Sequence, residues 1–327
     1  MFDIITMGSS TVDVFAYTEK DFVTIKDKDG KEFIAYPSGS KILIKKLDFY
    51  IGGGGSNTAT TFARMGFKTG YLGKIGGDEN GLKIFKLLKK ENITFLGSLG
   101  DISGYSIVLD SADEDRTILT YKGCNNDLGY GEIKKANLKT KWFYFSSMVG
   151  KSFEAQKKLA EYANKNNIKI AFNPSSYQTE NGAAYLRDIL KYTHILILNK
   201  EEAIDLVGKE GKEEIEDLLK GLLALGPYIV IITDGKQGAH CYDEKDYYFI
   251  KPKNIKVVET TGAGDAFASG FVAGLMMRQG VEFSMKLAVI NAESVVQHYG
   301  AKNCILSKEK ALKLVSKDNR VVEKRKL

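Results

Sequence analysis

Apolar runs alternate with amphipathic segments over most of this chain, and the alternation predicts strands and helices in turn. Beyond Gly131 the predicted strands are 142–145, 169–172, 195–198 and 228–233. Helical spacing of apolar residues predicts helices between them at 153–166, 182–191, 200–207 and 213–225. Such alternation is typical of a parallel sheet that is covered by helices on both faces.

The same pattern extends to both ends of the chain. Near the N-terminus we expect a strand at 2–7, a helix at 58–65, a strand at 68–75 and a helix at 79–91. Toward the C-terminus we expect a hairpin at 237–242 and 247–250, a strand at 255–258, and helices at 266–278, 283–299 and 308–315. The fold class predicted is therefore α/β.

Two segments depart from this pattern. Residues 15–50 show no helical period and contain a turn signal at 28–30, so we expect hairpins there. Residues 93–121 contain short strands, notably 105–109 and 116–121, joined by an acidic turn at 111–115. We expect these two segments to pair into a small sheet that is separate from the main body.

Composition narrows the function classes without naming one. The 327 residues are 43% hydrophobic and 27% charged, which is typical of a globular chain, and the net charge is +6. The basic clusters at 41–46 and 320–326 are interpreted as solvated surface rather than as a nucleic-acid site. Three widely spaced cysteines, an N-terminus without signal-peptide features and the lack of a long apolar run predict a cytoplasmic protein with no membrane segment.

The stretch Glu259-Thr260-Thr261-Gly262-Ala263-Gly264-Asp265 carries the most chemistry. It opens an apolar, small-residue run that is predicted to be a buried helix. Amides at the start of a helix have no internal partner and bind anions, and small residues let a ligand approach them. Asp265 beside them suggests a base that deprotonates a hydroxyl while the amides hold a phosphoryl group. An ordinary helix cap followed by a first-turn acid is the alternative.

Further motifs point the same way. Gly52-Gly53-Gly54-Gly55-Ser56-Asn57-Thr58-Ala59 lies near the N-terminus, with Asn199-x-x-Glu202 and Thr233-x-Gly235-x-x-Gly238 in the middle. With the stretch around Asp265, these four motifs, in this order, resemble those of the ribokinase-like (pfkB-type) carbohydrate kinases. The resemblance runs from residue 2 to about residue 314. It implies a ribokinase-like, doubly wound, mostly parallel sheet flanked by helices, with a small β-sheet lid.

The resemblance also implies how the chain is divided and which residues act. The core would comprise 1–14, 51–92 and 126–327, and the lid 15–50 and 93–125. The catalytic residues would be Asp265 as base and Gly262, Ala263 and Gly264 as amide donors. The substrate-binding residues would be Asp13, Gly53, Gly54 and Asn57. The nucleotide-binding residues would be Thr233, Gly235, Gly238 and Asn199, while Glu202 and Asn199 would hold Mg²⁺ through water.

Competing roles stay open for several of these residues. Asn199 and Glu202 fit a helix capping box, Asn57 fits a helix cap, and Asp13, Gly235 and Gly238 fit turns. K⁺ is a further cofactor implied by some relatives, although Glu259 stands where many of them have Asp. Arg116 would lie in the second lid segment and close over a charged substrate, or it would form a surface ion pair.

The function implied is transfer of the γ-phosphate of ATP to a hydroxyl, expected to be primary, of a sugar or sugar derivative. A nucleoside kinase of the same family is the alternative, with Phe15, Tyr17, Phe33 and Tyr36 able to stack on a base. A non-catalytic sugar- or nucleotide-binding regulator is the second alternative. The partners expected are a small-molecule sugar or nucleoside and, through an exposed edge of the lid, a second copy of the chain.

Overall fold

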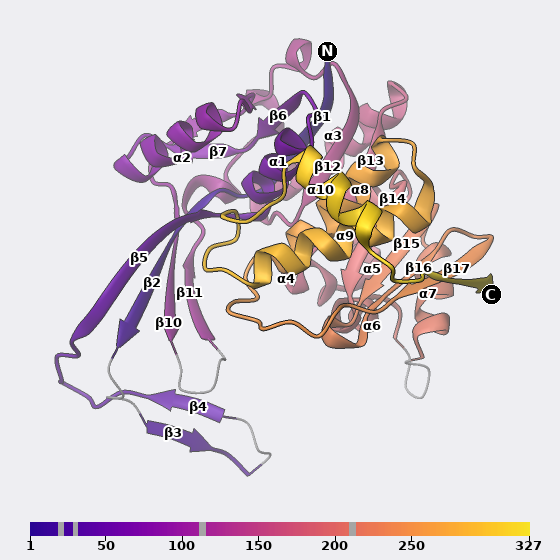
Figure 1. Cartoon of the computed structure of the whole chain (residues 1–327). Coiled ribbons are helices and arrows are strands. Elements are labelled where there is room, and N and C mark those ends of the chain that lie inside the picture. Colours follow the sequence, from indigo (N-terminus) through magenta and orange to yellow (C-terminus); the bar gives the residue numbers. More distant parts are fainter. Residues whose placement is uncertain (19–22, 29–31, 111–115, 209–213) are drawn as a thin grey trace.

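The polypeptide folds around one large sheet, from which a smaller sheet projects (Figure 1). The structure, a computed structural model, describes residues 1–18, 23–28, 32–110, 116–208 and 214–327. Within these ranges the large sheet has ten strands in the order β18-β17-β16-β15-β14-β13-β12-β1-β6-β8. The pairs from β15 to β8 are parallel, which confirms the predicted doubly wound, mostly parallel α/β fold.

The strands of the large sheet are short and mostly apolar. They are β1 (Phe2–Met7), β6 (Thr69–Leu72), β8 (Thr94–Phe95), β12 (Thr140–Ser146), β13 (Lys169–Asn173), β14 (Ile195–Asn199), β15 (Ile229–Thr233), β16 (Ala239–Tyr242), β17 (Asp246–Ile250) and β18 (Glu323–Lys326). Successive side chains point to opposite faces, so Phe143 and Phe145 of β12 enter one core and Tyr144 enters the other.

Helices cover both faces of this sheet. Apolar side chains of α3 (Gly150–Lys165), α5 (Gly182–Leu190), α6 (Lys200–Val207) and α7 (Ile215–Leu223) fill one core. Those of α1 (Gly54–Arg64), α8 (Ala263–Met276), α9 (Gly280–Val296) and α10 (Lys308–Lys317) fill the other. Helix α2 (Glu79–Lys90) packs in a third, smaller cluster, and α4 (Ser176–Thr179) precedes α5. Short 3₁₀ turns lie at Gly123–Asn126, Tyr130–Glu132, Lys135–Asn137 and Gly235–Gln237.

The strand order reverses beside β1. The chain first adds β6 and β8 on one side of β1, and later adds β12 to β15 on the other side. Ligands of open α/β sheets bind at the carboxyl ends of the strands next to such a reversal. The loop 8–10 after β1 and Ser146 at the end of β12 therefore mark the expected position of the site.

The small sheet contains β11-β10-β2-β5 and leaves the main body as a projection (Figure 1). Its strands are β2 (Thr11–Thr18), β5 (Ile44–Gly52), β10 (Gly104–Asp110) and β11 (Arg116–Tyr121). A hairpin of β3 (Val23–Lys26) and β4 (Glu32–Ala35) continues it, and β7 (Lys74–Gly76) pairs with β9 (Ser98–Gly100). The predicted small β-sheet lid is confirmed as an element of the fold.

The residue bounds of core and lid remain a prediction. Strand β2 of the small sheet begins at Thr11, within the segment 1–14 that was assigned to the core. Strand β8 lies within the segment 93–125 that was assigned to the lid, yet it pairs with β6 in the large sheet. Most of the predicted turn at 28–30, the whole of the acidic turn at 111–115 and the side chain of Arg116 lie outside the described residues.

One predicted strand was wrong, and one strand was not predicted. Residues 255–258 form no strand, because the amides of Val258 and Glu259 donate to the carbonyl of Val296 at the end of α9 instead of to a neighbouring strand. Conversely, β18 in the basic tail was not predicted as a strand; it pairs antiparallel with β17 at the edge of the sheet, and its residues are exposed, as expected for solvated surface. Its lysines and arginines are paired with acids, for example Lys324 and Lys326 with Asp246.

Other differences concern the ends of elements. The predicted strand 68–75 is two strands, because the chain leaves β1 after Leu72 and joins β9 from Lys74 onward. The predicted helices 58–65 and 266–278 begin earlier, at Gly54 and Ala263. Glycine disfavours a helix in isolation, so these starts are set by packing against the rest of the fold.

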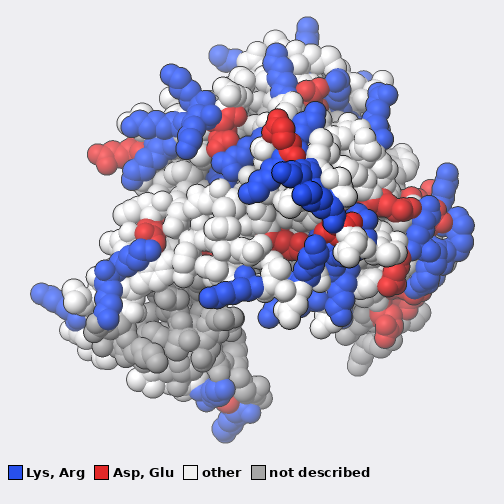
Figure 2. Space-filling view, viewed as in Figure 1, with Lys and Arg blue, Asp and Glu red and all other residues white. Residues whose placement is uncertain are grey.

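Charged residues are distributed over the face seen in Figure 2, with acidic side chains among the basic ones. This distribution fits the mixed composition of the sequence rather than a single basic stripe. None of the helices in the described ranges combines the length and the apolar character that a membrane span requires.

Candidate active site

The two glycine-rich motifs meet in the structure. The Asn57 side chain, in the first half of α1, donates from Nδ2 to Oδ2 of Asp265 at 2.7 Å, although the two residues are 208 positions apart. Asp265 is the third residue of α8, so it lies on the first turn of that helix. Packing of α1 against α8 on one face of the sheet thus brings together two residues that were predicted to bind substrate and to act as base.

Gly54 leaves room between Asp265 and the end of β12. A Cβ atom placed on Gly54 would lie 3.1 Å from Oγ of Ser146 and 3.2 Å from Oδ1 of Asp265. The hydroxyl of Ser146 and the carboxylate therefore approach the same point above the Gly54 backbone. Because the end of β12 borders the reversal of strand order, this point lies where the fold predicts a ligand.

Several buried polar atoms around Asp265 lack a hydrogen-bond partner among the described residues. They are Oδ1 of Asn57, the hydroxyl of Tyr144 and the hydroxyl of Ser146. Buried polar groups are normally paired, so such a concentration is typical of a place that receives water or a polar ligand. Sequence reasoning missed Tyr144 and Ser146, whose only signal was their position at the end of a predicted strand.

Burial raises the pKa of Asp265, while the hydrogen bond from Asn57 and the attraction of Lys302 oppose the change. A carboxylate with a raised pKa accepts a proton more readily than an exposed one. Burial likewise raises the pKa of Asp13, opposed by hydrogen bonds from Thr11 and Ser106 and by the charge of Lys302. The side chain of Asp13 is 8% exposed.

Asp13 lies on β2 of the small sheet and not in a turn. Oγ1 of Thr11 donates to Oδ1 of Asp13 at 2.8 Å. The other oxygen, Oδ2, would be 1.7 Å from a Cβ atom placed on Gly52, so the carboxylate rests directly on the glycine-rich segment. The alternative of a cap for Asn57 is also excluded, because the N-cap of α1 is Gly53.

The amides at the start of α8 are only partly free. Gly262 is the N-cap in the left-handed conformation (φ 83°), which lets the chain turn into the helix against Ala301. The amide of Ala263 donates to the carbonyl of Thr260 at 3.0 Å, so this donor is already used within the loop. A Cβ atom on Gly264 would meet no described residue within 4 Å, so this end of the helix leaves room for a ligand.

Lys302 is a functional candidate that sequence reasoning missed. Its side chain is buried, with the residue 6% exposed, and its Nζ donates to the carbonyl of Ile51 at 2.7 Å and to Oγ of Ser56 at 2.8 Å. Burial lowers the pKa of Lys302 to about 7, against the attraction of Asp13 and Asp265. The only signal in the sequence was an isolated lysine after Gly300-Ala301.

The loop predicted to bind nucleotide follows β15. Thr233 ends this strand and donates from Oγ1 to the carbonyl of Leu198 at 3.3 Å. Gly235 is exposed, and a Cβ atom there would meet none of the residues that the structure describes within 4 Å. Gly238 is different, since a Cβ atom there would lie 2.6 Å from the ring of Phe249. Packing against Phe249 therefore explains why residue 238 is glycine without any role in binding nucleotide. No such packing explains the glycine at 235.

Asn199 and Glu202 form the capping box of α6. Oδ1 of Asn199 accepts from the Glu202 amide at 2.7 Å, and Oε2 of Glu202 accepts from the Asn199 amide at 2.9 Å. Burial, with Asp205 and Glu201 nearby, raises the pKa of Glu202 to about 7. The described residues contain no group of three or more acidic, histidine or cysteine side chains arranged to hold a metal, so binding of Mg²⁺ by Glu202 and Asn199 through water stays a prediction. Capping and this role are compatible.

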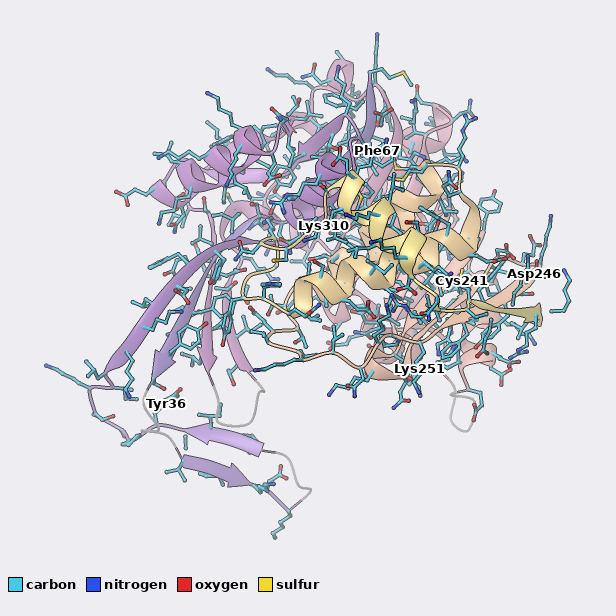
Figure 3. All side chains as sticks on the ribbon, in the orientation of Figure 1. Tyr36, Phe67, Cys241, Asp246, Lys251 and Lys310 are labelled. Atoms are coloured by element: carbon cyan, nitrogen blue, oxygen red, sulfur yellow. The ribbon has the colours of Figure 1, made fainter. Side chains whose placement is uncertain are left out.

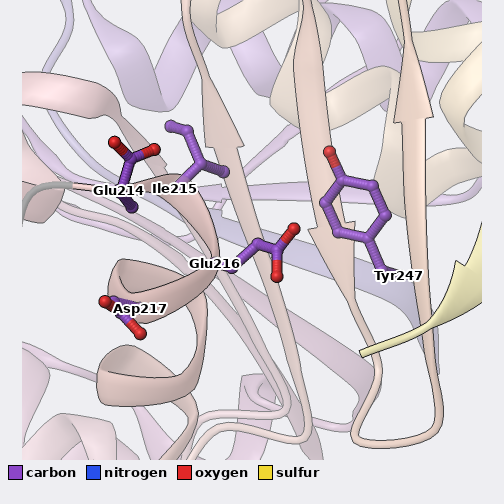
Figure 4. Close-up of a pocket in the computed structure, with 5 residues that line it drawn as sticks. All are labelled: Glu214, Ile215, Glu216, Asp217 and Tyr247. Atoms are coloured by element: carbon purple, nitrogen blue, oxygen red, sulfur yellow. The ribbon is translucent and has the colours of Figure 1, made fainter.

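A pocket of another kind lies at the start of α7 (Figure 4). It is lined by Glu214, Ile215, Glu216, Asp217 and Tyr247, none of which belongs to the predicted site.

Tyr36, which was considered as a residue that stacks on a base, lies at the outer end of the small sheet beside the β3–β4 hairpin (Figure 3). Phe15 is buried against Tyr50, with ring centroids 5.4 Å apart, so its ring is already packed.

A doubly wound sheet with a projecting β lid, and a carboxylate at a helix start facing a glycine-rich loop, define an α/β protein that binds small molecules. The profile of the pfkB family carbohydrate kinase matches residues 3–308. The chain therefore belongs to this family, whose members are phosphotransferases with a hydroxyl acceptor. The predicted membership, class of function and class of enzyme are confirmed.

The names of similar proteins state different acceptors. The chain is 26% identical over 288 residues to the 5-dehydro-2-deoxygluconokinase of Halalkalibacterium halodurans, covering 83% of this chain and 87% of that protein. It is 29% identical over 282 residues to the cytidine kinase of Thermococcus kodakarensis, covering 82% and 93%. A putative ribokinase II from E. coli, solved with ATP and Mg²⁺, superposes with a TM-score of 0.81 at 18% identity, covering 97% and 100%.

Proposed function

We propose that this protein transfers the γ-phosphate of ATP to a hydroxyl group, expected to be primary, of a sugar or a sugar derivative. The observation that carries this proposal is the 2.7 Å hydrogen bond from Asn57 to Asp265, which unites the two glycine-rich motifs at the reversal of strand order. The family supplies the reaction class, and the 5-dehydro-2-deoxygluconokinase relative supports a sugar-derived acceptor.

In this proposal Asp265 is the general base. The acceptor hydroxyl docks above Gly54, between Asp265 and Ser146, and Asp265 accepts its proton as the oxygen attacks the γ-phosphorus of ATP. The bond from that phosphorus to the bridging oxygen breaks, and ADP leaves. Asn57 fixes the orientation of the carboxylate through Nδ2, and its Oδ1 is left to accept from a second hydroxyl. Asp13 contacts further hydroxyls from the lid, and Gly53 and Gly54 let the backbone approach the sugar.

The phosphoryl group lies at the start of α8. The amides of Gly262 and Gly264 donate to it, and the amide of Ala263 joins them when it leaves the carbonyl of Thr260. The phosphate chain of ATP extends toward Thr233, Gly235, Gly238 and Asn199. Mg²⁺, held by Glu202 and Asn199 through water, would offset charge on the phosphates. The chain's own residues orient the reactants and hold the proton at Asp265.

A coupled assay for ADP tests this proposal. The acceptors are D-ribose, D-fructose, 5-dehydro-2-deoxygluconate, cytidine and adenosine, each with ATP and Mg²⁺, and Asp265→Asn is the blank. ADP release that depends on one of the sugars and is lost in the variant supports the proposal. Sugar-dependent ADP release that persists in Asp265→Asn contradicts the assignment of the base, and binding of a sugar without ADP release supports the non-catalytic regulator.

A nucleoside kinase is the second candidate function. Tyr17 of β2 and Tyr299, which follows α9, meet edge to face with ring centroids 5.9 Å apart. Tyr17 lies on the same face of β2 as Asp13, because side chains two positions apart share a face. These two rings are suited to contact a base beside a bound sugar, and the cytidine kinase relative supports this acceptor. Cytidine or adenosine turning over far faster than the sugars decides for this candidate.

A second copy of the chain is proposed as a partner through the lid. On the lid face opposite Asp13, the side chains of Leu47, Phe49, Ile107 and Leu119 are between 36% and 55% exposed. Exposed apolar patches of this kind mark interaction sites. Light scattering of the purified protein should give the mass of a dimer, and Phe49→Lys should shift it to the monomer. A monomeric wild-type protein contradicts the proposal.

Potassium activation and a cytoplasmic location are the remaining parts of the proposal. Glu259 is 3% exposed, and its Oε2 accepts from the amide of Gly300 at 2.9 Å, so the loop that would bind K⁺ is tied to the chain after α9. Potassium activation is tested by measuring activity in KCl and in tetramethylammonium chloride, and equal rates contradict it. Cytoplasmic location is tested by cell fractionation.

A further inference from the structure

The four residues Tyr299, Gly300, Ala301 and Lys302, which we call the tether segment, together contact the lid, the start of α8 and the glycine-rich loop. The ring of Tyr299 meets Tyr17 of the lid, and a Cβ atom on Gly300 would lie 2.7 Å from Tyr50. The side chain of Ala301 packs against Gly262. A short segment beyond α9 is thus in contact with both the lid and the start of α8.

Lys302 completes these contacts at the point where the lid strand β5 leads into helix α1. Its Nζ donates to the carbonyls of Ile51 (2.7 Å) and Gly52 (3.3 Å) and to Oγ of Ser56 (2.8 Å). An ammonium group has three donors. All three are used by the protein, so Lys302 has none left for a substrate or a phosphate.

The tether segment is itself fixed in place. Arg64 of α1 donates to the carbonyls of Lys302 (2.9 Å) and Ile305 (3.0 Å), and it pairs with Glu91 at 2.6 Å. The groups whose charges act on the Lys302 ammonium are Asp13 on β2, Asp265 on α8, Glu91 after α2 and Arg64 on α1. Two of these are the carboxylates that the proposed reaction uses.

We propose that Lys302 is a positioning residue for phosphoryl transfer, one that fixes the glycine-rich loop by three hydrogen bonds and supplies the positive charge that Asp13 and Asp265 face. The expected effect on acceptor kinetics rests on the proposed function, whereas the expected effect on the pKa of Asp13 and Asp265 does not. The carbonyls that Lys302 holds belong to the residues immediately before Gly53 and Gly54. Losing the ammonium therefore changes the shape of the acceptor site and the protonation of both carboxylates without removing a group that touches substrate.

Lys302→Met tests the proposal, because methionine keeps much of the side-chain length and removes the charge and the donors. Lys74→Met is the matched control, since Lys74 also donates to a carbonyl, that of Asp127 at 3.2 Å, but contacts none of the site residues. Kinetics use ATP with whichever acceptor of the screen is phosphorylated. Nucleotide affinity is measured separately by calorimetry with Mg²⁺ and the non-hydrolysable analogue AMP-PNP.

We expect kcat/KM for the acceptor to fall by about tenfold or more in Lys302→Met, as for other lost hydrogen bonds to charged groups. The affinity for AMP-PNP should stay within about twofold, and Lys74→Met should change neither. Unchanged acceptor kinetics overturn the proposal. Equal losses of acceptor turnover and AMP-PNP affinity also overturn it, because they indicate a general structural role. If Lys302→Met does not fold, Ser56→Ala replaces it, because this variant removes one of the three acceptors of the Lys302 ammonium. The same criteria apply, and the expected fall in kcat/KM for the acceptor is smaller.

A second measurement does not depend on the substrate. Carbon-13 carboxyl resonances of aspartate, assigned with Asp13→Asn and Asp265→Asn, are titrated with acid and base in the wild type and in Lys302→Met. Removal of the positive charge should raise the pKa of Asp13 and Asp265, and unchanged values overturn the electrostatic part. A further outcome is that the two pKa values rise in Lys302→Met even though the wild type phosphorylates none of the acceptors. That result contradicts the proposed function but supports the electrostatic role of Lys302.

Discussion

The acceptor side and the nucleotide side of the candidate site hold their residues by different means. On the acceptor side Asp13, Asn57 and Lys302 are buried, and the side chains of Asn57 and Lys302 bond to Asp265 and Ser56, residues from distant segments of the chain. On the nucleotide side Asn199 and Gly235 are exposed, and the bonds are those of a local helix cap and a turn.

This difference indicates where specificity is set. A buried network of charges allows few alternative arrangements, so the acceptor side is expected to discriminate between hydroxyl compounds. A helix cap and an open glycine loop can hold a phosphate chain with little regard to the rest of the ligand. Changes on the acceptor side should therefore cost more activity than changes on the nucleotide side, which the following predictions test.

The largest effect is expected for Asp265→Asn. Loss of the general base should lower kcat about 10²–10⁴-fold, with the KM for ATP nearly unchanged. Steady-state kinetics with the accepted substrate measure both values. A variant that keeps more than a tenth of the wild-type kcat would place the base elsewhere.

Gly54→Ala should give the next largest effect. The new Cβ atom would lie about 3 Å from both Ser146 and Asp265, where the acceptor hydroxyl docks. We expect kcat/KM for the acceptor to fall about 10–100-fold, because small misplacements of reacting groups are costly. Gly131→Ala is the control, since within the described part of the chain its Cβ atom would have no neighbour closer than 4 Å. Equal kinetics of both variants would remove Gly54 from the acceptor side.

Glu202→Gln tests the nucleotide side. Replacing the carboxylate should raise the Mg²⁺ concentration for half-maximal activity by about 10-fold or more, while saturating Mg²⁺ should restore most of kcat. A Mg²⁺ titration at fixed ATP measures this shift. If saturating Mg²⁺ restores nothing, Glu202 acts on the reaction itself and the contrast between the two sides is weaker than proposed.

The smallest effect concerns stability and pH. Lys302 has a pKa of about 7 in the folded protein and the ordinary lysine pKa of 10.5 when unfolded, so the unfolded chain binds the proton more tightly between these values. Its contribution to the free energy of unfolding is therefore present at high pH and is lost as the pH falls to about 7, with a slope of at most about 1.4 kcal/mol per pH unit.

Urea unfolding of the wild type and Lys302→Met between pH 7 and 8.5 measures this contribution. The free energy of unfolding of the wild type should rise with pH relative to that of the variant. Parallel curves would show that the ammonium is not buried as described. This window avoids the thiols of Cys124 and Cys241, whose pKa values burial raises above 9.0.

Most of the fold was predictable because its signals are local. Periodicity gave strand 2–7 and helix 200–207 with the bounds that the structure has, since each is a continuous apolar or amphipathic run. Strand β18 was missed because its sequence, EKRK, is charged throughout. Its place is determined by the free edge of β17 and by ion pairs with Asp246, neither of which is visible along the sequence.

The candidate site was predictable where a residue belongs to a motif. Glycine spacing identified Asp265 and Asn57, which the structure brings into contact. Ser146, Tyr144 and Lys302 could not be found in this way, because each is an ordinary residue at the end of a strand or beyond a helix. Their importance arises from the packing of segments that are more than 80 residues apart, such as Gly54 with Ser146 (146 − 54 = 92).

Strand β5 ends at Gly52 and helix α1 begins at Gly54, so a single residue separates the lid from the core at this point. Gly53 has a φ of 92°, and its neighbours are fixed by Ser9 on one side and by the tether segment on the other. In the proposed function, a movement of the lid at this connection would either change the torsion angles of Gly53 or rotate the first turn of α1 together with Asn57. Because Asn57 donates to Asp265, covering the acceptor and orienting the proposed base would then occur together.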